Sequence, residues 1–144
     1  MGSSKVCQTM TGEKGRARAL TKTILVIDDQ FGIRMLLQEV LEREGYTVYA
    51  AANGGEALAL VQEKKPDLVL LDMKIPGMDG LEILTAMRKI APEQKVVMMT
   101  AYGELDLVRE AAVLGALGHF TKPFDIDELR KYIVRVLGPQ SDAG

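Results

Sequence analysis

The feature that most constrains how this chain folds is the alternation of short apolar runs with longer amphipathic stretches. Strand-length runs stand at 23–27, 47–51, 68–71, 96–99 and 119–121. Runs that are apolar throughout are typical of strands buried on both faces of a parallel sheet. After each run, apolar residues recur at helical spacing. Strands that alternate with helices predict right-handed crossovers and a parallel sheet with helices on both faces. The sequence thus predicts an α/β fold of five units, with the flavodoxin-like strand order as the first candidate.

Capping residues and glycines mark the expected helix boundaries. Asn53 and Glu56 have the spacing of a capping box, and so do Asp125 and Glu128. Gly45 follows the first helical pattern, where a terminating glycine is common. These signals separate the five strand–helix units from one another.

The five units predict one domain over residues 23–137. Residues 1–22 show no apolar periodicity and mix glycine, serine, threonine and basic residues, so we expect a flexible leader there. Residues 138–144 are expected to form a flexible tail. Because the five units account for 23–137, we expect no DNA-binding output domain.

Composition excludes several broad classes of protein. The chain has 144 residues, 47% of them hydrophobic and 26% charged, with a net charge of −2. This balance predicts one soluble domain with no general attraction to nucleic acid or to anionic membranes. No apolar run reaches the roughly 18 residues of a membrane span. The single cysteine, Cys7, cannot form a disulfide within the chain, which favours a cytoplasmic location.

Polar residues follow four of the predicted strands at the point where each strand ends. They are Asp28, Asp29, Asp72, Thr100 and Lys122. In an open parallel sheet, ligands bind outside the carboxyl ends of the strands. We therefore expect these side chains to converge on one small site.

Three converging carboxylates repel one another, and a hard divalent cation such as Mg²⁺ relieves that repulsion. Lys122 could pair with a carboxylate or a phosphoryl oxygen, and the Thr100 hydroxyl could donate to the same phosphoryl group. An ionised Asp72 could then attack phosphorus while metal and lysine stabilise the equatorial oxygens. A plainer alternative remains open for Asp29, which could simply cap the helix that begins near Gly32.

Four stretches of the sequence resemble the response-regulator receiver domains of bacterial two-component systems. They are residues 24–29, 70–80, 99–102 and 122–124. The resemblance implies that Asp72 is the phosphoacceptor and that Asp28, Asp29, Asp72 and the backbone carbonyl of Lys74 bind Mg²⁺, with Mn²⁺ as an alternative. It also implies that Thr100 and Lys122 contact the phosphoryl group.

Longer stretches resemble the single-domain regulators of the endospore-forming phosphorelay. These stretches are residues 28–34, 71–80, 100–106 and 115–128. The resemblance implies a phosphotransferase in a limited sense, which takes a phosphoryl group from a sensor histidine kinase and passes it to a histidine phosphotransferase. An aspartyl-phosphate phosphatase is a further expected partner.

A partner surface is expected around the start of the first helix and across the cleft from it. Its residues are Gln30, Gly32, Ile33, Leu36, Pro123 and Phe124. Because the apolar residues at the helix start cannot all point inward, one is expected to be exposed, and the orientation of Ile33 is open. His119 stands where many receivers carry a switching aromatic ring. We interpret it as an exposed surface side chain, with a switch role as the alternative.

Two other functions compete with a phosphorelay intermediate. A stand-alone receiver would act only by binding a target protein when phosphorylated. A phosphatase of the haloacid-dehalogenase type also forms an aspartyl phosphate, but it needs an Asp-x-Asp arrangement after the first strand. Asp28-Asp29-Gln30 lacks that arrangement, so this class ranks last.

Overall fold

The structure is a computed structural model that describes residues 21–101 and 104–138. Cys7 lies outside the described residues, as do the predicted leader up to residue 20 and the predicted tail from residue 139. Among the residues described, no helix is long and apolar enough to cross a membrane.

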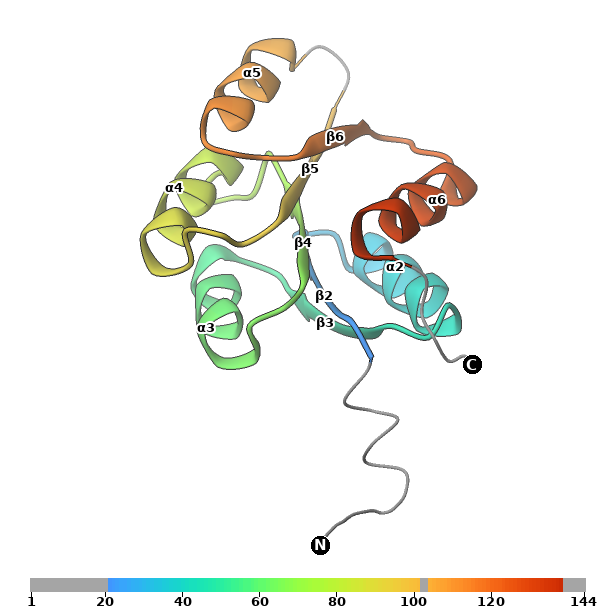
Figure 1. The fold of residues 1–144 in the computed structure, drawn as a ribbon. Coiled ribbons are helices and arrows are strands. Elements are labelled where there is room, and N and C mark those ends of the chain that lie inside the picture. The colour runs from blue at the N-terminus through green and yellow to red at the C-terminus, as the bar shows by residue number, and fades with distance from the viewer. Residues whose placement is uncertain (1–20, 102–103, 139–144) are drawn as a thin grey trace, which may run out of the picture.

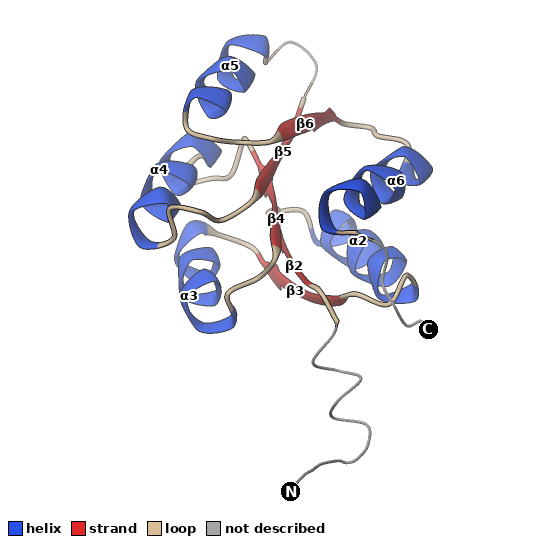
Figure 2. Cartoon of the chain, in the orientation of Figure 1, coloured by secondary structure: helices blue, strands red, loops and turns tan. Residues whose placement is uncertain are grey.

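Five strands alternate with five helices along the described chain, as the apolar runs predict (Figure 2). The strands are β2 (Thr23–Ile27), β3 (Thr47–Ala51), β4 (Leu68–Asp72), β5 (Val96–Thr100) and β6 (Gly118–Thr121). The helices are α2 (Phe31–Arg43), α3 (Gly54–Lys64), α4 (Gly80–Ile90), α5 (Leu105–Val113) and α6 (Ile126–Leu137). The α/β prediction is confirmed.

The five strands form one parallel sheet in the order β3-β2-β4-β5-β6. The chain starts near the middle of the sheet, moves to one edge and then crosses to the other side. This is the flavodoxin-like order. The direction of winding reverses between β2 and β4, and the crevice expected for ligands lies at the carboxyl ends of these two strands. The predicted strand order is confirmed.

Helices cover both faces of the sheet, with α3, α4 and α5 on one face and α2 and α6 on the other (Figure 1). Each face has its own buried cluster. Leu25, Ile27 and Leu71 point toward the first group of helices, whereas Ile24 and Val26 point toward the second. Because successive side chains of a strand alternate between faces, a strand buried on both sides must be apolar throughout.

The helix starts agree with the capping signals in most places. Asn53 accepts a hydrogen bond from the Glu56 amide, and Asp125 accepts from the amides of Asp127 and Glu128. A complete capping box between Asp79 and Glu82 was not predicted. At the other end of α2, Gly45 follows the helix with a φ of 99°, a left-handed conformation that favours glycine.

The alternative role for Asp29 as a helix cap is wrong. The N-cap of α2 is Gln30, and no side chain caps that position. Instead, the Gln30 amide donates to Asp28 Oδ1 at 2.9 Å. The Asp29 carboxylate is therefore not used by the helix.

Candidate functional site

The carboxyl ends of four neighbouring strands bring the predicted polar residues to one edge of the sheet. Asp28 and Asp29 follow β2, Asp72 ends β4 and Thr100 ends β5. Asp72 is in register with Met99, one residue before Thr100. Lys122 follows β6, whose last residue, Thr121, is paired with Thr100.

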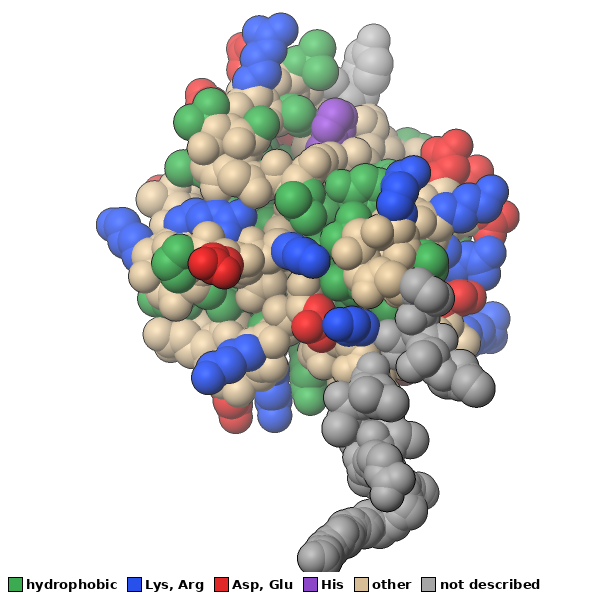
Figure 3. All heavy atoms as spheres, viewed as in Figure 1, with side chains coloured by type: hydrophobic (Ala, Val, Ile, Leu, Met, Phe, Trp, Pro, Cys, Tyr) green, Lys and Arg blue, Asp and Glu red, His purple; other side chains and the backbone are tan. Residues whose placement is uncertain are grey.

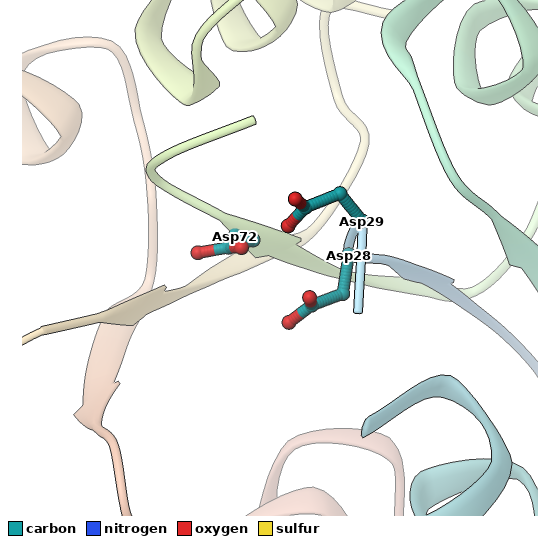
Figure 4. A group of neighbouring side chains, drawn as sticks. All are labelled: Asp28, Asp29 and Asp72. Carbon is teal, nitrogen blue, oxygen red and sulfur yellow. The ribbon is translucent and has the colours of Figure 1, made fainter. Parts of the chain in front are cut away.

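Three carboxylates gather at this edge, as Figure 4 shows. One oxygen from each of Asp28, Asp29 and Asp72 lies within 4.8 Å of the other two. Asp28 is completely buried, Asp72 is 6% exposed and Asp29 is exposed. A deep carboxylate pair therefore lies beneath an exposed third one.

Lys122 supplies a positive charge to the two buried carboxylates. Its Nζ donates to Asp28 Oδ2 at 2.6 Å and lies 3.4 Å from Asp72 Oδ2. Gln30 Oε1 is a third neighbour at 3.5 Å. The lysine thus lies between two strands that are not adjacent to its own.

The pKa of Asp72 reflects the crowding of negative charge. Burial and the neighbouring Asp28 carboxylate raise the pKa of Asp72 to about 6, although Lys122 and the Lys74 amide act in the opposite direction. Burial lowers the pKa of Lys122, but its hydrogen bond to Asp28 and its attraction to both carboxylates outweigh that effect and raise it. The lysine remains charged, and it does not fully compensate Asp72.

The donor set fits a hard divalent cation. The three carboxylates carry three negative charges when ionised and Lys122 carries one positive charge, which leaves an excess of two at the edge. Carboxylate oxygens are the ligands that Mg²⁺ and Mn²⁺ prefer.

Thr100 lies buried at the end of β5. Its hydroxyl donates to the Phe120 carbonyl at 3.3 Å and lies 3.5 Å from the Thr121 hydroxyl. The Lys122 amide donates to the Thr100 carbonyl at 2.7 Å. The β5 and β6 ends are therefore joined directly before the lysine, which fixes where its side chain begins.

Lys74 contacts the site through its backbone, whereas its side chain pairs with a residue outside the carboxylate cluster. Its amide donates to Asp72 Oδ1 at 3.3 Å, whereas its Nζ lies 3.6 Å from Glu104 Oε2. Glu104 was missed by the sequence reasoning. Its only signal was an acidic residue at the start of a helix, which is ordinary for a first turn.

The predicted partner surface is mostly accessible, and it includes side chains that were not predicted. Gln30, Gly32 and Pro123 are exposed, Leu36 is 42% exposed, and Ile33 and Phe124 are half-buried. The expectation that an apolar side chain near the helix start is exposed is confirmed. Phe31 and Met35, which are 67% and 49% exposed, extend the apolar surface further. They were missed, although their i, i+4 spacing sets them off from buried Leu37 and Leu41.

His119 is exposed on β6, the edge strand of the sheet. The only histidine of the chain is purple in Figure 3, where Lys and Arg side chains are interspersed with Asp and Glu. The ring is thus available to solvent.

Comparison with known proteins agrees with this geometry. The family model described as "Response regulator receiver domain" matches residues 24–134. The chain is 55% identical over 123 residues to sporulation initiation phosphotransferase F of Bacillus subtilis, a match that covers 85% of this chain and 99% of that protein. It is 39% identical over 118 residues to regulatory protein AtoC of Escherichia coli, covering 82% of this chain and 26% of that protein.

Solved structures share the fold as well. A CheY-like response regulator receiver domain protein from Methanospirillum hungatei is 35% identical and superposes with a TM-score of 0.78, covering 86% of this chain and 99% of that one. Sequence and structure therefore identify relatives of the same domain, and that domain contains the acidic edge and Lys122. The chain belongs to the response regulator receiver domain family.

Proposed function

We propose that residues 23–137 act as a single receiver domain that relays a phosphoryl group through Asp72. A sensor histidine kinase donates the group, and a histidine phosphotransferase receives it, in a cytoplasmic phosphorelay that initiates sporulation. The observation that carries the proposal is the carboxylate cluster with Lys122 bonded into it. The match to sporulation initiation phosphotransferase F along 99% of that protein's length supports the choice of a relay over an output regulator.

Asp72 is the nucleophile in this proposal. One of its carboxylate oxygens forms a bond to phosphorus as the phosphorus–nitrogen bond of the donor phosphohistidine breaks, and the bonding electrons stay with the imidazole nitrogen. Lys122 stabilises the charge that develops on the phosphoryl oxygens, and the Thr100 hydroxyl turns from the Phe120 carbonyl to donate to the same group. The chain is thus a phosphotransferase in a limited sense, because it is itself the intermediate.

Asp28, Asp29, Asp72 and the backbone carbonyl of Lys74 would hold Mg²⁺ or Mn²⁺. A bound divalent ion would supply charge neutralisation for the carboxylates and the phosphoryl oxygens. The excess of two negative charges at the edge supports this assignment.

Transfer onward requires that a partner's histidine reach the same edge. The rim of that edge is formed by the start of α2 and the Pro123–Phe124 segment. Gln30, Gly32, Leu36 and Pro123 are exposed there and Ile33 and Phe124 are half-buried, and together they would form a docking rim for a helical partner. An aspartyl-phosphate phosphatase would use the same approach.

A transfer assay tests the relay. The chain is labelled with radioactive phosphate by a histidine kinase of the sporulation type, separated from the kinase, and mixed with a histidine phosphotransferase domain. The proposal predicts that label leaves the chain and appears on the phosphotransferase histidine within minutes. Asp106→Asn, which removes an exposed carboxylate elsewhere, is the matched control and should transfer as the wild type does.

Label that stays on the chain until it is hydrolysed to inorganic phosphate would contradict the relay. That outcome would favour the alternative, a stand-alone receiver that acts by binding a target protein when phosphorylated.

A further inference from the structure

Glu104 joins two loops of the site without belonging to the carboxylate cluster. Its Oε1 accepts a hydrogen bond from the Ala101 amide at 2.8 Å, and its Oε2 lies 3.6 Å from Lys74 Nζ. Ala101 directly follows β5, and Lys74 lies two residues after Asp72. One side chain therefore links the residues that follow β4 and β5.

The orientation of the Glu104 side chain is unusual for its position. Glu104 is the N-cap residue of α5, yet its side chain makes no capping hydrogen bond to that helix. It points back toward the sheet edge and is only 12% exposed, whereas its Lys74 partner is largely exposed. A carboxylate that is removed from water in this way needs its two partners, because an unpaired buried charge is costly.

A phosphoryl group on Asp72 would change the balance of charge around this carboxylate. The Lys74 amide already contacts Asp72 Oδ1, so the Lys74 side chain starts next to the modified atom. The phosphoryl group would add a second anion within reach of the same ammonium. Since Glu104 and the phosphoryl group carry like charges, each would weaken the hold of the other on Lys74.

We propose that Glu104 is a positioning residue that competes with the Asp72 phosphoryl group for the Lys74 ammonium and so shortens the lifetime of the phosphorylated state. This inference rests on the proposed function, since it requires that Asp72 be phosphorylated. With Glu104 in place, Lys74 is held aside and water can reach phosphorus. Without the Glu104 charge, Lys74 pairs with the phosphoryl group and covers it.

Glu104→Gln isolates the charge from the hydrogen bond. The amide oxygen of glutamine can still accept from Ala101, but it cannot form an ion pair with Lys74. The chain is phosphorylated with acetyl phosphate and Mg²⁺, the reagent is removed, and loss of the group is followed by mass spectrometry. We expect the phosphoryl lifetime to lengthen about fivefold, the effect of one charge at this separation in a partly hydrated site. Glu110→Gln on the exposed part of α5 should leave the lifetime unchanged.

A double-mutant cycle separates this role from a merely structural one. In a Lys74→Ala background, Glu104→Gln should no longer lengthen the lifetime, and Glu104→Asp should behave like the wild type or fall between the two. Hydrogen exchange of the Ala101 amide in the unphosphorylated chain gives a second readout, with protection retained in Glu104→Gln and lost in Glu104→Ala.

Three results would overturn the inference. They are a lifetime in Glu104→Gln equal to that of the wild type, an effect of equal size in the Lys74→Ala background, and an Ala101 amide that exchanges as fast in the wild type as in Glu104→Ala. Failure of the wild type to become phosphorylated on Asp72 would instead overturn the proposed function, together with the competition that depends on it.

Discussion

The two ends of the sheet differ in how far their buried charges are compensated. At the carboxyl end, three carboxylates face Lys122 with an excess of negative charge, and the pKa of Asp72 is raised to about 6. At the amino end, the half-buried Arg88 guanidinium donates to the carbonyls of Leu114, Pro92, Gln94 and Gly115 at 2.6–3.1 Å. There the donors of one side chain meet acceptors from two loops.

This difference separates stability from function within one fold. The Arg88 network joins the segments that precede β5 and β6, and it uses four of the five N–H donors of the guanidinium within the protein. At the acidic edge, Asp72 is buried beside the Asp28 carboxylate, an arrangement that disfavours its charged form and is common at functional sites. The comparison predicts that substitutions at the amino end change stability, whereas substitutions at the carboxyl end change chemistry.

Lys122→Met should have the largest effect on chemistry. Loss of the ammonium that touches both buried carboxylates removes electrostatic stabilisation of the phosphoryl oxygens, so the rate of Asp72 phosphorylation should fall about 10²- to 10³-fold. The rate is measured with acetyl phosphate and Mg²⁺ by mass spectrometry. Arg88→Met should keep a rate within about twofold of the wild type. An equal loss in both variants would show that the two ends of the sheet do not differ in their role in the chemistry.

Arg88→Ala should have the largest effect on stability. Four carbonyls lose a charged donor, so the free energy of unfolding should fall by about 3 kcal/mol. Urea denaturation followed by circular dichroism measures this change. Lys89→Ala, at the exposed neighbouring position, should stay within about 0.5 kcal/mol of the wild type. A fall below about 1 kcal/mol in Arg88→Ala would show that the network contributes little.

Asp72→Asn should stabilise the metal-free protein at neutral pH. The folded-state pKa of Asp72, about 6, is above its value near 4 in the unfolded chain. Its contribution to stability is therefore present below pH 4 and is lost as the pH rises through 6. At pH 7.5 the variant should be more stable by about 2 kcal/mol, and the gap should close as the pH falls toward 4.

Mg²⁺ should stabilise the folded protein through the same carboxylate. The ion should stabilise the wild type at pH 7.5 more than it stabilises Asp72→Asn, because the variant lacks one of the three carboxylates. Thermal unfolding at several Mg²⁺ concentrations measures the difference. Equal shifts in the two proteins would remove Asp72 from the metal site.

Asp79→Ala should have the smallest of these effects. Asp79 and Glu82 form the capping box at the start of α4, at the same carboxyl end of the sheet as the site. Loss of the cap should lower the free energy of unfolding by about 1 kcal/mol, with phosphorylation of Asp72 retained. A loss of phosphorylation comparable to that of Lys122→Met would show that the α4 start is part of the chemistry.

The sequence predicted the fold well because the relevant signals are local. Apolar runs such as Leu68–Leu71 and caps such as Asn53 act within a few residues, and the strand-end rule then places Asp28, Asp72 and Lys122 at one edge. The same rule says nothing about distances. The bond from Lys122 to Asp28 joins residues 94 positions apart, and it depends on how the whole sheet closes.

Side-chain contacts across loops were beyond what the sequence pattern could predict. The Glu104–Lys74 pair and the Arg88 network connect residues whose helices were predicted without any indication of which loops meet. The amphipathic pattern of α2 also did not predict that Phe31 and Met35 are exposed. Periodicity identifies the buried side of a helix, but neighbouring helices decide how far burial extends around it.

Direct detection of the modified residue tests whether Asp72 is the phosphoacceptor. The full chain is incubated with acetyl phosphate and Mg²⁺, and the modified peptide is located by mass spectrometry, with Asp72→Asn treated in parallel. We expect one phosphoryl group on Asp72 in the wild type, and no modification when Mg²⁺ is chelated before acetyl phosphate is added or when Asp72→Asn is used. Modification that persists in Asp72→Asn, or that falls on another residue in the wild type, would contradict the assignment of Asp72 as the phosphoacceptor.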